Sequence, residues 1–580
     1  MNWNPTWICP SNDLGDPAAV FGTSFVFEKK ITHANLTITA MGVYEARLNG
    51  RRVGQFVMAP GWTSYHKRLQ YQEYDITDLL TNGKNEIEVT VGKGWYRSPL
   101  PGWLGCAYQD ELRSRPCGLA AQITLTFEDG SSKILSTNES WKVSDGPVRF
   151  SEIYDGEIYD AAKTPSLDQS VSIFDGPTDT LILQQGEEVC EQERLAVKKV
   201  FVTPNGETVL DFGQNMTGYV ELFVNAKAGD CVDLSFAEVM DKEGNFYTEN
   251  YRSAKAQYHY ICKDGIQTWH PSLTFYGFRY IRINDFPGGI DCVKPENFTA
   301  IAVHSNMKRT GFLSSSNTLL NQLFSNIIWG QKGNFLDVPT DCPQRDERLG
   351  WTGDAQVFVR TACLNYDAEK FFTKWLADLA SDQHDDGYVG HVIPDLLQNP
   401  QASSAWGDAA AICPWQVYLA FGNKQILKNQ YQSMKKWIDY ITSTTTTKYL
   451  WTGGTHYGDW LGLDAPSGSY KGSSNEDFIA SAFYAYSTSL VIQAGTVLGE
   501  DVSALSTLYE NIVNTFQKTW PTYHTQTECV LAAHFKLAKN CQAAADQLAD
   551  MVRACGTKLQ TGFVGTPYLL HVLSDYGHTD

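Results

Sequence analysis

The chain has 580 residues, more than one hydrophobic core accommodates, which predicts three or four domains. Its composition, 43% hydrophobic and 19% charged, is ordinary for a soluble globular protein. Lys and Arg number 46 and Asp and Glu 65, which gives a net charge of −19 spread along the chain. This charge argues against nucleic acid and anionic membranes as partners, since both require basic faces, and it suits a neutral ligand.

The 13 cysteines are scattered, without a C-x-x-C pair or a His cluster at ligand spacing. This pattern indicates neither a disulfide framework nor a zinc site, and it favours a reducing compartment. The N-terminus lacks a basic start and the apolar run of a signal peptide, and no window reaches the roughly 18 apolar residues of a membrane span. We therefore expect a cytoplasmic protein without metal or cofactor, monomeric or homo-oligomeric.

Short alternating runs broken by Gly, Asn and Asp fill residues 20–190 and again 196–304. The runs typical of strands include Phe25–Phe27, Leu36–Thr39, Ile87–Val91, Val209–Phe212 and Tyr280–Ile283, with Leu48–Gly50 as a hairpin turn. Such short, evenly spaced strands are typical of β-sandwiches. We predict an N-terminal β-sandwich region over 1–195 and a second β-sandwich over 196–304.

After Ser305 the apolar residues recur at helical spacing. One face of the first helix would carry Leu319, Leu320, Leu323, Phe324, Ile327 and Ile328. Further helices are expected at 367–380, 408–421, 424–442, 476–498, 501–517, 540–553 and near 567–574. Long loops rich in Gly, Pro and Asp lie between several of them, at 337–353, 385–407 and 451–475. Helices joined by such loops predict an α/α barrel whose loops gather over one end.

The acidic segment from Asp337 to Asp354 is the most informative part of the sequence. It reads D-V-P-T-D-C-P-Q-R-D-E-R-L-G-W-T-G-D and holds five carboxylates and two Arg within 18 residues. Pro and Gly prevent a continuous helix there. By composition alone, the segment could equally be a solvated loop whose Arg residues neutralise their neighbours.

Glycoside hydrolysis needs one carboxylic acid to protonate the departing oxygen and a second carboxylate across the sugar ring. The acid must hold its proton near neutral pH. Asp341, Asp346 and Asp354 would favour the protonated form of Glu347 by like-charge repulsion, whereas the two Arg of the segment would favour its charged form. The sequence leaves this balance open.

The acidic segment resembles the signature of bacterial α-L-rhamnosidases, glycoside hydrolase family 78. In that family the Glu of R-D-E-R is the general acid, which falls on Glu347. The resemblance implies an inverting hydrolase that removes terminal non-reducing α-L-rhamnose from glycosides or polysaccharide fragments. The candidate substrate-binding residues of the segment are Asp341, Arg345, Asp346, Trp351 and Asp354.

The resemblance covers the rest of the chain, since 30–190 and 196–304 are similar to the family's two sandwiches and 305–580 to its (α/α)6 barrel. The stretches that carry it include Gly92–Tyr96, Asp211–Asn215, Tyr276–Tyr280, Ser404–Asp408 and Tyr457–Leu461. Trp406 and Trp460 would then be aromatic walls of the rhamnose pocket, with Asp459 beside them. Each has a plainer alternative, because a Trp often fills a core and an Asp often caps a helix.

An inverting enzyme also needs a general base, which in the family is a Glu in a Gly-Ala-Thr-Thr-x-Trp-Glu-like segment of the late barrel. This sequence lacks that segment, and it shows roughly ten helices where a closed six-hairpin barrel needs twelve. The resemblance thus implies a C-terminally incomplete chain, with the base expected beyond residue 580. If the chain is complete, another carboxylate such as Asp354 or Asp459 is the base, or activity is lost.

Two other functions stay open. A six-hairpin glycosidase acting on another sugar would lack the Trp walls, and a non-catalytic glycan-binding protein would hold rhamnose without cleaving it. Trp62 and Trp95 of the first sandwich could form a sugar-binding patch, although a core or interdomain role is favoured. A metal-dependent lyase or hydrolase is less favoured, because carboxylate clusters can bind calcium but no EF-hand-like spacing is present. The aglycone is not indicated by the sequence.

Overall fold

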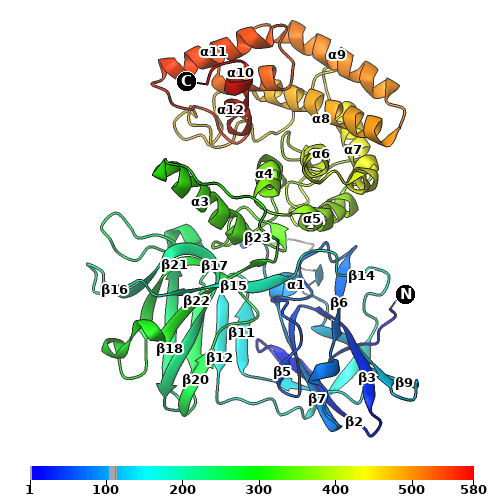
Figure 1. Ribbon diagram of the computed structural model, residues 1–580, viewed down its shortest axis with the longest axis vertical. Coiled ribbons are helices and arrows are strands. Elements are labelled where there is room, and N and C mark those ends of the chain that lie inside the picture. The colour runs from blue at the N-terminus through cyan, green and yellow to red at the C-terminus, as the bar shows by residue number, and fades with distance from the viewer. Residues whose placement is uncertain (1–2, 104–110, 113, 580) are drawn as a thin grey trace. The chain divides into compact units, whose positions relative to one another are not determined.

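The structure, a computed structural model, describes residues 3–103, 111–112 and 114–579 (Figure 1). The chain divides into two compact units. The β unit comprises Met1–Met307 and Phe312–Leu349, and the helical unit comprises Lys308–Gly311 and Gly350–Asp580. The division at Leu349 therefore falls inside the acidic segment.

The first sheet of the β unit has 12 strands among the described residues, in the order β14-β6-β3-β8-β1-β13-β10-β2-β7-β4-β5, with β9 paired to β8. Its strands are β1 (Trp7–Pro10), β2 (Ala19–Phe27), β3 (Ile31–Met41), β4 (Val43–Leu48), β5 (Arg51–Arg52), β6 (Leu69–Asp75), β7 (Gly83–Gly92), β8 (Gly118–Phe127), β9 (Ser132–Ser136), β10 (Lys142–Asp145), β13 (Gln169–Phe174) and β14 (Leu181–Leu183). In β7, buried Ile87 and Val89 alternate with exposed Glu86 and Glu88, the period-2 pattern of a half-buried strand.

Trp62 and Trp95 belong to the core of this region. Their rings stack 5.6 Å apart at 8°, and their exposed fractions are 1% and 2%. Trp95 lies on the short helix α1 (Gly94–Arg97). The core role favoured for both residues is therefore confirmed.

The second sheet has ten strands among the described residues, in the order β11-β12-β19-β18-β21-β17-β22-β15, with β16 and β20 paired to β17. They are β11 (Val148–Glu152), β12 (Gly156–Asp160), β15 (Val189–Ala196), β16 (Lys199–Val202), β17 (Thr208–Ala226), β18 (Cys231–Ala237), β19 (Gln257–Ile261), β20 (Gly265–Trp269), β21 (Tyr276–Asp285) and β22 (Phe298–Ser305). Strands β11 and β12 lie between β10 and β13 in the chain, yet β12 pairs in parallel with β19. The chain thus enters the second sheet, returns to the first, and enters the second again.

Helix α3 (Thr318–Asn334) completes the β unit. Asn317 caps its N-terminus by accepting from two backbone amides, and the Thr217 hydroxyl donates to the Gly333 carbonyl at 2.7 Å. The expected apolar face is partly exposed, since Leu319 and Leu323 have exposed fractions of 79% and 54%. Two short strands, β23 (Phe335–Leu336) and β24 (Val338–Pro339), then lead into the acidic segment.

The helical unit contains, among its described residues, nine helices: α4 (Thr352–Asn365), α5 (Glu369–Asp382), α6 (Ala409–Phe421), α7 (Lys424–Thr444), α8 (Glu476–Leu498), α9 (Ser503–Thr519), α10 (Gln526–His534), α11 (Cys541–Ala554) and α12 (Thr566–Asp575). The seven helices expected after residue 360 correspond to α5–α9, α11 and α12. Helices α4 and α10 were not expected. With α3, ten described helices follow Ser305.

The expected fold class, β domains followed by a helical region, is confirmed (Figure 1). The domain limits at 195 and 304, and the incompleteness of the barrel, stay predictions.

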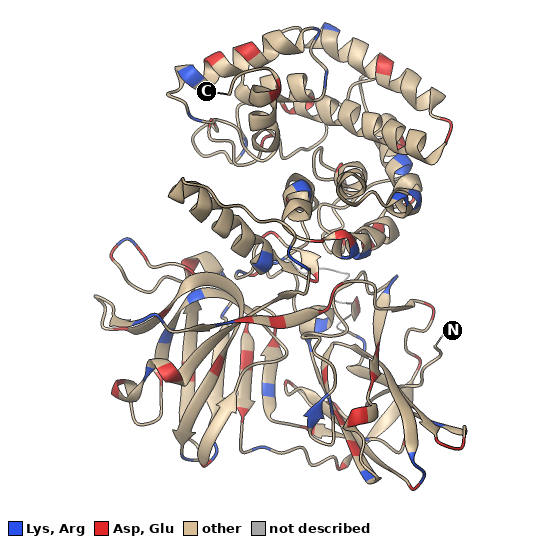
Figure 2. Ribbon diagram, in the orientation of Figure 1, with Lys and Arg blue, Asp and Glu red and all other residues tan. Residues whose placement is uncertain are grey.

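Each of the twelve cysteines in the described ranges is free. No described helix has the length and apolarity needed to cross a bilayer. Figure 2 shows Lys and Arg interspersed with Asp and Glu along the drawn ribbon of both units.

Candidate active site

In the β unit, the acidic segment is fixed to the rest of the protein by Arg348. Its side chain is 1% exposed, and Nη1 donates to the carbonyls of Ile153 at 2.8 Å and Phe275 at 2.9 Å. Nη2 and Nε donate to the carbonyls of Gln344 and Arg345. The backbone of Arg348 has a positive φ of 54°, a conformation rarely adopted outside glycine. Arg348 therefore fixes the shape of the segment through its hydrogen bonds to four backbone carbonyls.

Arg345 links the two carboxylates that the sequence singles out. Its Nε donates to Oε2 of Glu347 at 2.7 Å, and its Nη2 donates to Oδ2 of Asp341 at 3.0 Å. The second oxygen of Asp341 accepts the backbone amide of Leu349 at 2.9 Å. The side chains of Glu347 and Asp341 are 11% and 7% exposed. Two nearly buried carboxylates thus share one guanidinium.

The pKa of Asp341 is raised to about 7, mainly by burial and next by the nearby carboxylate of Glu347. Hydrogen bonds to Asp341 and the charge of Arg345 act in the opposite direction. Asp341 can therefore hold a proton near neutral pH, and it shares Arg345 with Glu347, the candidate acid.

Arg252, from the loop after β18, is a member of this cluster that sequence reasoning missed. Its Nε donates to Oδ1 of Asp346 at 2.6 Å, and its Nη2 donates to Oε2 of Glu347 at 3.0 Å. Asp346 also accepts the hydroxyl of Ser253 at 2.5 Å. The guanidinium lies 5.0 Å from the ring centre of Trp103, a cation–π contact. No signal in one sequence connects Arg252 to a motif 95 residues away.

The backbone of the candidate acid is fixed as well. The Tyr154 hydroxyl donates to the Glu347 carbonyl at 2.6 Å, and the Gly102 amide donates to the Asp346 carbonyl at 3.0 Å. A Cβ on Gly102 would lie 2.6 Å from the Cβ of Asp346, so only glycine allows this approach. Glu347 is therefore held through both its backbone and its carboxylate.

Asp341, Cys342 and Glu347 place three potential metal-ligand atoms within 4.8 Å of one another. Arg345, however, already supplies a positive charge between the two carboxylates. Burial and the neighbouring Asp341 raise the pKa of the Cys342 thiol well above its usual value, so it does not act as a thiolate ligand at neutral pH. The cluster is better suited to holding a proton than a metal ion.

In the helical unit, an aromatic cluster surrounds Tyr457. The ring of Trp406 lies 4.5 Å from that of Tyr457, Trp460 lies 5.7 Å away and Trp351 6.1 Å away. Phe563 stacks on Trp406 at 6.0 Å and 11°. The three tryptophans selected from the sequence therefore lie in one cluster, and Tyr457 and Phe563 are members that the sequence analysis did not select.

His391 and Trp406 bring unpaired polar atoms to this cluster. Nδ1 of His391 accepts from Nδ2 of Asn399 at 2.7 Å and lies 3.0 Å from the Tyr457 hydroxyl. Burial lowers the pKa of His391 to about 4, so the ring is neutral at pH 7 and its Nε2 carries the hydrogen. That Nε2 and the Nε1 of Trp406 are buried without a partner among the described residues. Both can donate to hydroxyl groups.

Asp459 differs from the other predicted residues because the protein already occupies both of its oxygens. Oδ2 accepts from the Thr527 hydroxyl at 2.5 Å and the Gly562 amide at 2.7 Å. Oδ1 accepts from the amides of Val564 at 3.0 Å and Gly565 at 3.3 Å. These bonds favour a structural role, and binding of substrate by Asp459 stays a prediction.

Asp354 lies half-buried in the first turn of α4, where the helix dipole favours a carboxylate.

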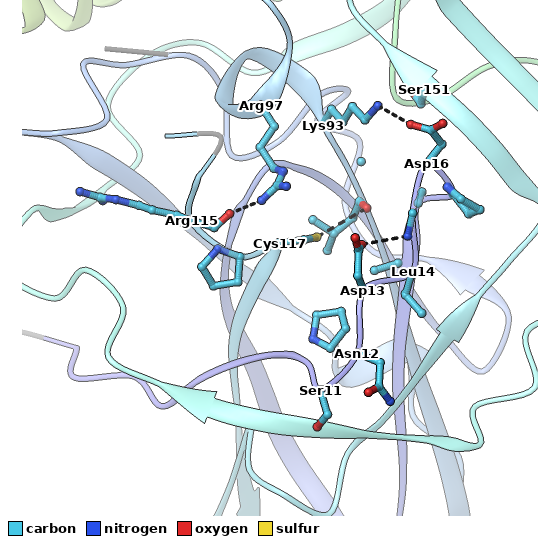
Figure 3. Close-up of a pocket in the computed structure, with 18 of the residues that line it drawn as sticks. Ser11, Asn12, Asp13, Leu14, Asp16, Lys93, Arg97, Arg115, Cys117 and Ser151 are labelled. Carbon is cyan, nitrogen blue, oxygen red and sulfur yellow. Dashed lines mark hydrogen bonds and ion pairs between the residues drawn. The ribbon is translucent and has the colours of Figure 1, made fainter. Parts of the chain in front are cut away.

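A separate cavity of about 330 Å³ lies in the region of the first sheet (Figure 3). Two of its cationic side chains are paired, Lys93 with Asp16 at 3.1 Å and Arg115 with Glu111 at 2.8 Å, and Arg97 donates to the Arg115 carbonyl. None of the predicted site residues lines it. The candidate site residues therefore form two clusters, the carboxylate cluster in the β unit and the aromatic cluster in the helical unit.

Comparison with known proteins identifies the family. An α-L-rhamnosidase N-terminal domain model matches residues 29–197, a bacterial α-L-rhamnosidase concanavalin-like domain model matches 201–304, and a bacterial α-L-rhamnosidase 6 hairpin glycosidase domain model matches 308–580. The crystal structure of native α-L-rhamnosidase from Aspergillus terreus is 36% identical over the whole chain, with a TM-score of 0.94, and the chain covers 70% of it. The chain belongs to the α-L-rhamnosidase family. The resemblance of the acidic segment is thereby confirmed.

Other α-L-rhamnosidases are similar over nearly the whole chain. A relative from Formosa agariphila is 37% identical over 96% of this chain and 62% of its own length, and one from Streptomyces avermitilis is 38% identical over 95% and 54%. The Streptomyces avermitilis enzyme complexed with L-rhamnose has a TM-score of 0.91, at 36% identity over 97% of this chain and 55% of that one. This chain thus spans 54% to 62% of the length of these two curated relatives.

Proposed function

We propose that this α-L-rhamnosidase family member hydrolyses terminal non-reducing α-L-rhamnose from rhamnosides with inversion at the anomeric carbon. The observation that carries the proposal is the Asp341–Arg345–Glu347 cluster, in which two nearly buried carboxylates share one guanidinium and the pKa of Asp341 is raised to about 7. Similarity to an enzyme whose crystal contains L-rhamnose supports the choice of sugar.

Glu347 acts as general acid in this proposal. Its proton passes to the glycosidic oxygen as the bond from that oxygen to the anomeric carbon breaks, and water forms the new bond on the opposite face of the ring. A second carboxylate takes a proton from that water. Arg345 and Arg252 orient the carboxylate of Glu347 by donating to its Oε2. Asp341 and Asp346 complete the charge balance around the two guanidinium groups.

The aromatic cluster binds the sugar in this proposal. Trp351, Trp406 and Trp460 offer apolar faces to the ring carbons and to the methyl group that distinguishes a 6-deoxy sugar. The unpaired Nε1 of Trp406 and Nε2 of His391 donate to its hydroxyls. Asp354 is a further contact of the sugar in this proposal.

We also propose that the protein is located in the cytoplasm.

The experiment compares the 580-residue chain with Glu347→Gln and with the exposed control Glu500→Gln. The substrates are a p-nitrophenyl α-L-rhamnoside and a rhamnosyl disaccharide, and L-rhamnose binding is measured by calorimetry. Glu347→Gln should lose about 10²–10⁴ in kcat/KM on the disaccharide and less on the nitrophenyl glycoside, whose leaving group needs little protonation. Proton NMR of the first product should show the β-anomer.

Each contrary outcome identifies a different error. If Glu347→Gln hydrolyses the disaccharide at the wild-type rate, Glu347 is not the general acid. Rhamnose binding without turnover in the 580-residue chain would mean either that the general base lies outside these residues or that the protein only binds glycans. An α-anomer as first product would exclude inversion, and neither binding nor hydrolysis of rhamnosides would favour a glycosidase for another sugar.

A further inference from the structure

Asp408 is a buried carboxylate of the helical unit that has no role in the function proposed above. It is 0% exposed and occupies the N-cap position of α6, two residues after Trp406. An Asp at an N-cap usually accepts from backbone amides in the first turn of its own helix. The side chain of Asp408 makes no such bond to the described residues of α6. Its carboxylate is therefore directed to other parts of the unit.

This carboxylate connects the loop before α6 to two other helices. Its Oδ2 accepts from the backbone amide of Ala405 at 2.7 Å. Its Oδ1 accepts from Nε1 of Trp437 in α7 at 2.9 Å and from the hydroxyl of Ser487 in α8 at 2.6 Å. Burial raises the pKa of the Asp408 carboxyl, and these three bonds oppose the shift. One side chain thus ties the loop to α7 and α8.

The first of these bonds holds a backbone that an alanine rarely adopts. Ala405 has a positive φ of 68°, in the left-handed region that disfavours residues with a Cβ. Such a conformation persists only where the surrounding structure holds it. The bond from the Ala405 amide to Asp408 provides that hold. Trp406 follows directly, so the same bond fixes the direction in which the chain enters Trp406.

Gly407 fixes the chain on the other side of Trp406. A Cβ on Gly407 would clash with the ring of Trp437, so the backbone at Gly407 packs directly against that ring. The Nε1 of the same ring donates to Asp408. The backbone on both sides of Trp406 is therefore held by contacts that meet at one carboxylate.

The ring of Trp406 depends on this backbone, because no hydrogen bond of its own fixes it. Its Nε1 is buried without a partner among the described residues. Its other contacts are with rings, since it lies 4.5 Å from Tyr457 and stacks on Phe563 at 6.0 Å. A shift of the backbone at Ala405 or Gly407 would therefore move the ring.

We propose that Asp408 is a positioning residue of the sugar site, which holds residues 405–407, and with them the Trp406 ring, in the orientation that binds rhamnose. The inference rests on the proposed function, because it takes Trp406 as an aromatic wall of the rhamnose pocket. Asp408 touches no substrate in this role and acts only through the residues on either side of Trp406.

The groups around Asp408 require two acceptor oxygens. The amide of Ala405 and the indole of Trp437 can only donate, and they meet different oxygens of the carboxylate. Asn has the same shape but a single acceptor oxygen, so Asp408→Asn would place an amide NH2 against one of these donors. Ser487→Ala removes one donor and leaves the other two bonds in place, so its effect should be smaller and in the same direction.

The test measures binding of L-rhamnose and of L-mannose to the 580-residue chain by calorimetry. Asp408→Asn should bind rhamnose at least about tenfold more weakly than the wild type, and Ser487→Ala about threefold more weakly. The number of sites per chain should stay at the wild-type value. L-Mannose carries a hydroxymethyl group in place of the methyl group of rhamnose, and the preference for rhamnose should fall because a displaced ring no longer covers the methyl group.

Thr488→Val is the matched control. Thr488 is the next residue of α8, it is buried as Ser487 is, and its hydroxyl donates only within its own helix, to the Tyr484 carbonyl at 2.7 Å. This variant loses a buried hydroxyl without touching the Asp408 contacts. It should bind both sugars as the wild type does.

Wild-type affinity in both Asp408→Asn and Ser487→Ala would overturn the proposal. The same holds for fewer sites at unchanged affinity, which indicates a role in folding alone, and for equal losses in Ser487→Ala and Thr488→Val. If Asp408→Asn does not fold, the comparison of Ser487→Ala with Thr488→Val decides. Failure of the wild type to bind rhamnose would instead refute the proposed function, so the two failures are distinguishable.

Discussion

Arg252 donates from its Nη2 to Oε2 of Glu347 across 3.0 Å, although the two residues are 95 positions apart in the sequence. The same Oε2 accepts from Arg345, so two guanidinium groups point at one oxygen. Arg252 does so from a backbone with φ of 55° and ψ of −113°, which only glycine adopts readily. The protein tolerates this conformation at the residue that connects the second sheet to the candidate acid.

Replacing Arg252 should lower catalysis by misplacing Glu347. Arg252→Ala should reduce kcat by about 10²-fold, since a shift near 1 Å at the reacting group can cost that much. Arg252→Gly should lose the same activity. Its free energy of unfolding should nevertheless exceed that of Arg252→Ala by about 1–2 kcal/mol, because glycine relieves the backbone strain, and it should melt at a higher temperature. Kinetics and thermal melts of the pair check both statements. A Gly variant less stable than the Ala variant would show that the backbone is not strained.

Arg348 should be essential for folding rather than for catalysis. Arg348→Met preserves length but removes the guanidinium that donates to four backbone carbonyls, two of them those of Ile153 and Phe275. We expect a loss of at least about 3 kcal/mol in the free energy of unfolding. Urea denaturation followed by fluorescence measures it. Arg553→Met, at a side chain that is 60% exposed, should change stability by less than about 0.5 kcal/mol.

Four of the helices found from the sequence have one polar face, whereas α6 and α8 were found without one. Helices α5, α7, α9 and α11 are amphipathic, so their period is readable. Helix α10 was missed because every residue from Gln526 to Ala533 is buried, which leaves no polar face to reveal the period. Helix α4 was missed for a similar reason, and its first turn lies in a segment whose Gly residues predict a loop.

Gly353 should control the position of Trp406. A Cβ at Gly353 would lie 2.4 Å from Cε2 of the Trp406 ring, too close for any side chain. Gly353→Ala should therefore cost about 1–3 kcal/mol and weaken rhamnose binding by displacing the ring. Calorimetry with L-rhamnose checks this. Gly330→Ala, where a Cβ meets nothing within 4 Å, should leave rhamnose binding unchanged, and an equal loss in both variants would contradict the explanation.

The buried Asp341 should make stability depend on pH. Burial raises its pKa to about 7 in the folded chain, whereas an unfolded Asp has a pKa near 3.9. The folded state binds more protons between these values, so this group's contribution to stability falls as pH rises from about 4 to about 7. Asn cannot ionise, so Asp341→Asn lacks this loss of stability. The melting temperature of Asp341→Asn minus that of the wild type should therefore increase as the pH rises from about 4 to about 7. Asp550→Asn, with a side chain 80% exposed, should show no such trend.

The candidate site was only partly predictable, because a motif contains its own residues and not those that fold against it. Asp341, Arg345 and Glu347 lie within seven positions, and the structure brings them together. Arg252 reaches the same cluster from a loop of the second sheet, and Tyr457 and His391 reach the tryptophans from two different loops. Such pairings depend on tertiary contacts that leave no periodic or compositional signal in one sequence.

The passage of β11 and β12 into the second sheet means that the two sheets cannot be separated by one cut in the chain. Residues 148–160 lie between strands of the first sheet, yet they form the edge beyond β19. A break after residue 160 separates β11 and β12 from the second sheet, and a break before residue 148 separates β13 and β14 from the first. The two sheets should therefore be expressed, engineered and exchanged between relatives as one module.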